Sequence, residues 1–77
     1  MIKRVYCKSK FNQFFKKGNV YETVRYDDNF TGKLEIFTNN GDVGAVVKVV
    51  DGELTDQKHF KLIRNCVEEY ICKGIMW

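Results

Sequence analysis

Proline is absent from the sequence, and histidine occurs once in its 77 residues. Without proline the chain has no proline-rich linker, and its frequent aromatic and β-branched residues favour strands over a low-complexity tail. The single histidine, His59, belongs to no recognisable catalytic motif. We therefore predict a non-catalytic protein that needs no cofactor, in which His59 has a structural role.

Long apolar runs are also absent. No stretch approaches the roughly 20 apolar residues that cross a membrane, and the opening Met-Ile-Lys-Arg leads into polar sequence rather than into the apolar part of a secretion signal. These observations predict a cytoplasmic protein with no membrane partner. At 77 residues, the chain should form a single domain, residues 1–77.

Cysteine is scarce, and its spacing does not suit a metal site. Cys66 and Cys72 are six residues apart and Cys7 is distant from both, whereas zinc ligands come in pairs typically about two to four residues apart. In a cytoplasmic protein we expect all three cysteines to be reduced and buried as small apolar side chains.

Acidic residues are missing from the first eighteen positions, which hold six basic residues, while the remaining fifty-nine hold seven basic and ten acidic ones. The six basic residues are Lys3, Arg4, Lys8, Lys10, Lys16 and Lys17. Cations beside exposed aromatic rings can hold phosphates while bases stack on the rings. With Tyr6 or Tyr21 as the stacking ring, this segment predicts nucleic-acid binding as one candidate function.

Alternation of apolar and polar residues predicts five short strands. They cover residues 2–7, 20–26, 34–38, 43–50 and 59–63. Residues 39–42, Asn-Asn-Gly-Asp, are the strongest hairpin signal because Asn and Gly tolerate positive φ. The strand that follows is apolar on both faces apart from Lys48, which indicates a central or doubly covered strand. In the last strand, Phe60 and Leu62 should point into the core.

Helical spacing appears first in residues 10–17. Phe11, Phe14 and Phe15 follow the i, i+3, i+4 pattern of one helical face, and Ser9 before them is a candidate N-cap. The segment therefore predicts a short helix ending at Gly18. Because exposed phenylalanine is costly in so small a protein, most of these rings should pack in the core.

A second helical pattern lies in residues 65–77. Val67, Tyr70 and Ile71 share helical spacing with Glu68 and Glu69 outside, and we favour a short helix beginning at residue 65. Residues 70–72 would also suit a strand, so that alternative stays open.

These elements predict a mainly β fold with one or two short helices. Five short strands joined by tight turns are too few for two full sheets, so the economical architecture is a small, strongly bent antiparallel barrel of about five strands.

Several of these residues resemble a known family. The run Phe-Phe-Lys-Lys-Gly-Asn-Val-Tyr-Glu at residues 14–22, the hairpin at 39–42 and the late Phe60 are similar to the small SH3-like β-barrel early proteins of tailed bacteriophages. In that family a Phe, Lys-Gly-Lys, x-Tyr segment leads into the barrel and a late Phe closes it. The resemblance covers about residues 11–63, with Asn19 where a lysine is usual. It implies an SH3-like barrel and a viral origin, and it carries over no functional residue.

The leading functional hypothesis is a non-catalytic protein-binding module that modulates or inhibits a host protein. Ile75, Met76 and Trp77 are three consecutive large apolar residues, which would serve either as a lid over the barrel or as the contact for the partner. The nucleic-acid hypothesis is the alternative. A homodimer is a third possibility, because neither proline nor a visible bulge protects the strand edges.

Overall fold

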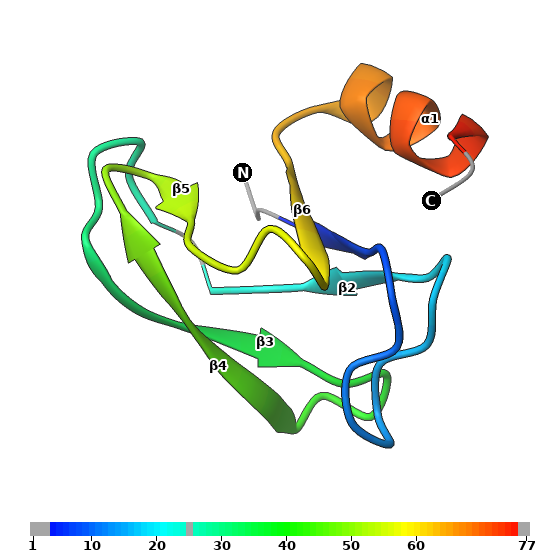
Figure 1. The fold of residues 1–77 in the computed structure, drawn as a ribbon. Helices are drawn as coiled ribbons and strands as arrows, with labels where there is room; N and C mark the ends of the chain where they lie inside the picture. Colours follow the sequence, from blue (N-terminus) through cyan, green and yellow to red (C-terminus); the bar gives the residue numbers. More distant parts are fainter. Residues whose placement is uncertain (1–3, 25, 76–77) are drawn as a thin grey trace.

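The computed structural model describes residues 4–24 and 26–75. Its elements, in chain order, are β1 (Arg4–Cys7), β2 (Val20–Glu22), β3 (Gly32–Phe37), β4 (Val43–Val50), β5 (Glu53–Leu54), β6 (Phe60–Ile63) and α1 (Cys66–Gly74) (Figure 1). The mainly β class predicted from the sequence is confirmed. The short β5 was not predicted. The strand expected over residues 20–26 ends at Glu22, earlier than predicted, and Arg25 within the expected range lies outside the described residues.

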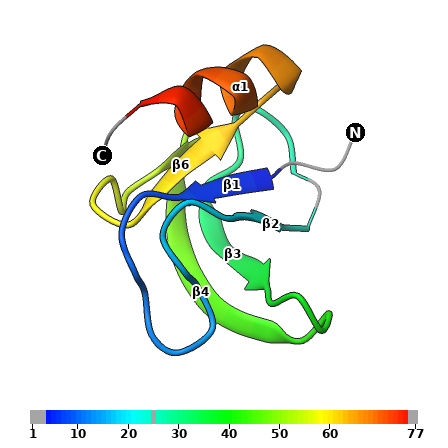
Figure 2. The same ribbon diagram turned by 90° about the vertical axis from the view of Figure 1, so that its right-hand side faces the viewer.

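The described strands form two three-stranded antiparallel sheets, in the orders β2-β1-β6 and β3-β4-β5. An isolated bridge between Thr23 and Ile36 joins β2 to β3. Figure 2 shows the two sheets facing one another, with α1 on the outer side of the first sheet, over β6. The sequence predicted a small, strongly bent barrel of about five strands. The described strands form two sheets instead of one continuous one, because β2 and β3 meet at a single bridge and not along a ladder.

The core lies between the two sheets. Its completely buried side chains come from both sheets and from the loop before β2; they are Val5, Cys7, Phe15, Leu34, Ile36, Val49 and Phe60. The rings of Phe15 and Phe60 pack edge to face with their centroids 5.6 Å apart, a favourable aromatic geometry. The inward direction predicted for Phe60 and Leu62 is confirmed, since both are buried in this cluster.

The β3–β4 hairpin forms where residues 39–42 predicted it. The Thr38 N–H donates to the Asp42 carbonyl at 2.7 Å, and Gly41 supplies the positive φ of the turn, at 88°. β4 lies between β3 and β5, so its central position is confirmed. The alternative, a strand covered on both faces, is wrong. Val43, Val46 and Val50 are exposed on the outer face of β4, and α1 covers the other sheet.

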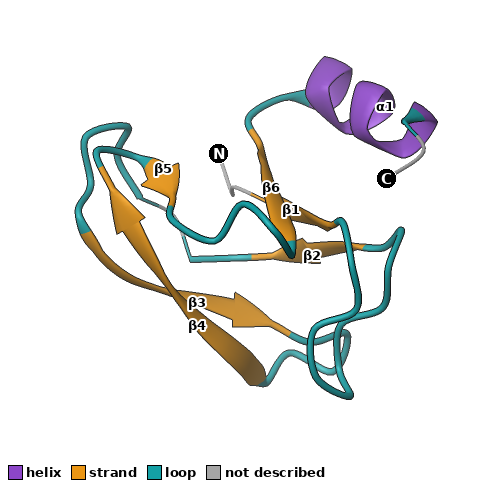
Figure 3. Cartoon of the chain, in the orientation of Figure 1, coloured by secondary structure: helices purple, strands orange, loops and turns teal. Residues whose placement is uncertain are grey.

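Residues 10–17 do not form the predicted helix. Figure 3 shows this segment as loop. The Phe11 N–H donates to the Phe15 carbonyl at 3.1 Å, and Asn12 between them has a left-handed φ of 50°. The Asn12 side chain accepts the Phe14 N–H at 2.7 Å, a local bond of the kind that competes with helix formation.

Two further helix signals in this segment have different outcomes. Ser9 is not an N-cap, because its hydroxyl donates to the Lys58 carbonyl at 3.2 Å. Gly18 does have the positive φ expected of a chain-reversing glycine, at 93°.

The helix favoured at residue 65 is confirmed as α1, so the strand alternative is not what forms. Asn65 is its N-cap, and the Asn65 side-chain oxygen accepts the Glu68 N–H at 2.9 Å. The Glu68 carboxylate in turn accepts the Arg64 N–H at 2.7 Å. The first bond satisfies one of the N–H groups that a helix start leaves unpaired, and the second ties the helix to the residue before its N-cap.

Candidate functional site

The apolar face of α1 points to solvent. Val67 is 66% exposed, Tyr70 82% and Ile71 52%. We call these three residues the α1 apolar face. Their spacing on one side of a helix was recognised in the sequence, but the expectation that the glutamates would lie outside them is wrong, since Glu68 and Glu69 are only partly exposed.

Polar contacts explain this orientation. Arg4 on β1 forms an ion pair with Glu69, with 2.5 Å between Arg4 Nη1 and Glu69 Oε1. Lys73 lies 3.6 Å from the second oxygen of the same carboxylate. Cys72 is the buried residue of α1, and it packs with Tyr6 and Ile63 on the outer side of the β1–β6 pair. The glutamate side of α1 therefore faces the sheet.

Among the residues that the sequence singled out after this helix, the structure describes Ile75. It is half-exposed, and its N–H donates to the Cys72 carbonyl at 3.4 Å. Ile75 does not act as a buried lid over the sheets. Met76 and Trp77 lie outside the described residues.

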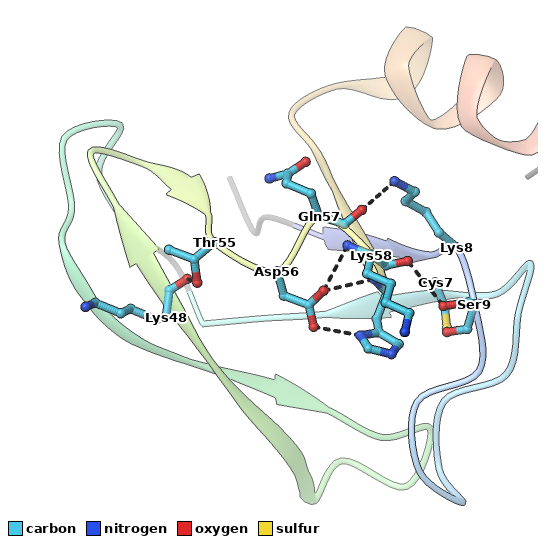
Figure 4. A network of polar contacts seen from close by, with 9 residues as sticks. Cys7, Lys8, Ser9, Lys48, Thr55, Asp56, Gln57 and Lys58 are labelled. Carbon is cyan, nitrogen blue, oxygen red and sulfur yellow. Dashed lines mark hydrogen bonds and ion pairs between the residues drawn. The ribbon is translucent and has the colours of Figure 1, made fainter.

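The structure separates the basic residues predicted to act together. Arg4, at the start of β1, forms an ion pair with Glu69. Lys8 follows the other end of β1, and its Nζ donates a hydrogen bond to the Gln57 carbonyl at 2.5 Å (Figure 4). Lys10, Lys16 and Lys17 are exposed in the same loop, and Lys3 lies outside the described residues.

Strand pairing adds two lysines that the sequence analysis missed. The Lys8 N–H donates to the His59 carbonyl at 2.7 Å, which places Lys8 beside Lys58. Tyr6 is the register partner of Lys61, so Lys61 also lies next to the start of this loop. No local signal could have found them, because they are distant in sequence and meet through the β1–β6 ladder.

The stacking role assigned to Tyr6 and Tyr21 is wrong, since they are only 4% and 3% exposed. Tyr6 packs under α1 with Ile63 and Cys72. The Tyr21 hydroxyl accepts the Lys16 N–H at 2.9 Å. Phe14 in this loop is 48% exposed. The prediction that most of the three phenylalanine rings pack in the core is confirmed, since Phe15 belongs to the core cluster and Phe11 packs against it.

His59 lies in a structural turn. Asp56 Oδ1 accepts the N–H groups of Lys58 and His59 at 3.0 and 2.9 Å, and Asp56 Oδ2 lies 2.9 Å from His59 Nδ1 (Figure 4). Burial raises the pKa of Asp56, but the bonds from the His59 backbone and ring and from Lys58 outweigh it and hold that pKa below its ordinary value of 3.8. The carboxylate therefore stabilises the β5–β6 turn.

Replacing Asp56 by alanine should lower the free energy of unfolding by about 1–2 kcal/mol at pH 7, because two backbone donors lose their acceptor. Since the pKa is lower in the folded state, this contribution is present above the unfolded pKa and is lost as the pH falls through the folded pKa. Urea unfolding at pH 7 and at pH 3 measures it. The gap between wild type and Asp56→Ala should shrink at pH 3, and an equal gap at both values would contradict the assignment. Asp56→Asn, which keeps the acceptor oxygen, is the matched control.

The cysteines are free thiols. Burial raises the pKa of the Cys7 and Cys72 thiols, which keeps them protonated. The expectation that all three are buried is wrong for Cys66, which is exposed at the first position of α1. Among the described residues, no group of three His, Cys, Asp or Glu side chains is placed to hold a metal ion.

No protein-family model, curated protein or solved structure matches the chain. Over residues 4–24 and 26–75, no helix combines the length and apolar character needed to cross a membrane.

Proposed function

We propose that the protein is a non-catalytic protein-binding module that contacts its partner through the α1 apolar face. The observation that carries the proposal is the outward direction of Val67, Tyr70 and Ile71. Burying such a side chain stabilises a folded protein or a complex by about 1.5–3 kcal/mol. Within this fold the three side chains stay exposed, so that stabilisation can come only from binding. An amphipathic helix that inserts one face into an apolar groove of another protein is a common mode of recognition.

The partner in this proposal is a host protein that binding modulates or inhibits. This part of the proposal rests on the resemblance of residues 11–63 to phage early proteins. If the chain is such a protein, its two sheets correspond to an incompletely closed SH3-like barrel, and it acts in the host cytoplasm. The partner surface should be an apolar groove about one short helix long, with Tyr70 at its centre.

Replacing Tyr70 and Ile71 together by serine should abolish capture of a partner from bacterial lysate. Thermal unfolding should change little, because substitutions at exposed sites usually cost within about 0.5 kcal/mol. Val46→Ser is the matched control, since Val46 is a similarly exposed apolar residue on the outer face of β4. A protein captured equally by wild type and the double variant would contradict the proposal.

A second candidate function is binding of single-stranded nucleic acid by the loop between β1 and β2. Its supporting observation is that Phe14, an exposed ring, lies in the same loop as the exposed Lys10, Lys16 and Lys17. A stacked base is worth about 1–3 kcal/mol, so Phe14→Ala should weaken oligonucleotide binding about fivefold or more. Affinity should also fall steeply with salt. Binding that is unchanged in both experiments would exclude this loop.

A further inference from the structure

The first part of the loop between β1 and β2 lies against the turn between β5 and β6. The Ser9 hydroxyl donates to the Lys58 carbonyl at 3.2 Å, and the Phe11 ring packs edge to face against the His59 ring, with their centroids 5.0 Å apart. Lys10 lies between these two contacts along the chain. Lys10 and Lys58, which are both exposed, therefore lie close together at the surface.

Lys8 extends this basic surface onto the first sheet. The Lys8 N–H donates to the His59 carbonyl at 2.7 Å, and the Lys8 Nζ donates to the Gln57 carbonyl at 2.5 Å. Lys8 therefore lies beside Lys58 at this end of the sheet (Figure 4). A carbonyl oxygen carries no net charge, so the Lys8 ammonium keeps its positive charge there.

Lys61 lies on the same face of the sheet as Lys8. Cys7 and Phe60 are register partners with completely buried side chains. Side chains alternate between the two faces along a strand, so Lys8 and Lys61 both point away from the core. Their charges also act on one thiol, since burial raises the pKa of Cys72 and the charges of Lys61 and Lys8 oppose that rise.

Positive charge dominates this surface. We call Lys8, Lys58 and Lys61 the turn lysines. The β1–β2 loop and the β5–β6 turn, residues 8–19 and 55–59, together contain five lysines and one acidic residue, Asp56. The Asp56 carboxylate accepts the N–H groups of Lys58 and His59, which commits it to the turn. The charge of this surface therefore favours an anionic ligand.

We propose that a single strand of nucleic acid, with one base stacked on Phe14, continues along the first part of the β1–β2 loop to the turn lysines, which bind its phosphates. The proposal rests on the second candidate function and adds to it the path of the strand and the contacts of Lys58 and Lys61. A basic track beside an aromatic ring is typical of proteins that bind single strands without sequence preference.

The chemistry of these contacts predicts which nucleic acid binds. The Phe14 ring can stack only on a base that is not already stacked within a duplex. Lysine side chains contact phosphates, which carry no sequence information. We therefore expect single strands to bind more tightly than duplexes, with no marked preference among sequences.

Fluorescence anisotropy with a labelled oligothymidylate of about ten nucleotides, measured over a series of salt concentrations, tests the proposal. For a single strand, the slope of log K against log salt is about −0.7 for each phosphate that the protein neutralises. The double variant Lys58→Gln/Lys61→Gln should therefore bind with a slope smaller in magnitude by about 1.4. Lys58→Gln alone should reduce the slope by about 0.7, and because Lys58 is exposed, this variant does not disturb the core.

The matched control is Lys33→Gln/Lys48→Gln. These two lysines are exposed register partners on β3 and β4, so the control removes the same charge from the other sheet. Its slope should equal that of wild type. An equal decrease of the slope in both double variants would overturn the proposal in favour of general surface charge.

Other outcomes separate this proposal from the candidate function on which it rests. Binding that is weakened by Phe14→Ala but keeps the wild-type slope in Lys58→Gln/Lys61→Gln would overturn the path and leave the loop as the site. No binding of the oligothymidylate by wild type at low salt would overturn both. A duplex of the same length that binds as tightly as the single strand would overturn the single-stranded path.

Discussion

Replacing Gly52 by alanine should lower the free energy of unfolding by more than about 3 kcal/mol, enough to leave much of a domain this small unfolded. Gly52 has a φ of 79°, and a Cβ built on it would lie 1.9 Å from the carbonyl oxygen of Asp28. The obstacle is backbone, so no side-chain rotation can relieve it. The Gly52 N–H also donates to the Phe30 carbonyl at 2.8 Å, which ties this turn to the neighbouring loop.

The matched control is Gly18→Ala. Gly18 has a φ of 93°, but a Cβ there would meet no atom within 4 Å. Gly18→Ala should lower the free energy of unfolding by about 1–2 kcal/mol, which is the cost of placing a residue with a Cβ in the left-handed conformation. Urea unfolding of both variants separates the two causes. Equal losses of stability would contradict the close approach of residue 52 to Asp28.

Replacing Phe15 by alanine should lower the free energy of unfolding by about 3–5 kcal/mol, the range for deleting a buried aromatic side chain. The Phe15 ring is completely buried, with its centroid 4.7 Å from that of Tyr21. It also lies against Gly44 on β4, where a Cβ would come within 2.8 Å of Phe15 Cζ. The ring thus fills the space where the loop before β2 meets the second sheet.

Phe14→Ala is the control for Phe15→Ala. Phe14 is about half exposed, so its loss should cost less than about 1 kcal/mol. The pair of variants also separates the observed loop from the helix that the sequence predicted, because a buried helical face would use both rings. Similar losses of stability from the two substitutions would contradict the loop.

The elements that the sequence predicted correctly are those encoded by local chemistry. The turn at Gly41 needs a positive φ, and the start of α1 needs the side-chain acceptor of Asn65; both signals act within a few residues. The alternation of Leu34 and Ile36 likewise fixed which face of β3 is buried.

The predictions that are wrong concern segments whose conformation depends on contacts with residues distant in the sequence. The phenylalanine spacing in residues 10–17 matches a helix, yet Phe15 is held in the core by residues of β2, β4 and β6. The spacing of the α1 apolar face predicted a helix but not its direction, which depends on the contact between Glu69 and Arg4.

The most direct test of the central claim is site-specific photo-crosslinking from α1. A photoreactive phenylalanine analogue at position 70 should give one crosslinked product of defined mass in bacterial lysate, because Tyr70 lies at the centre of the α1 apolar face. The same analogue at position 46, on the exposed face of β4, should give none. Crosslinking from position 46 but not from position 70, or from neither, would contradict protein binding through α1.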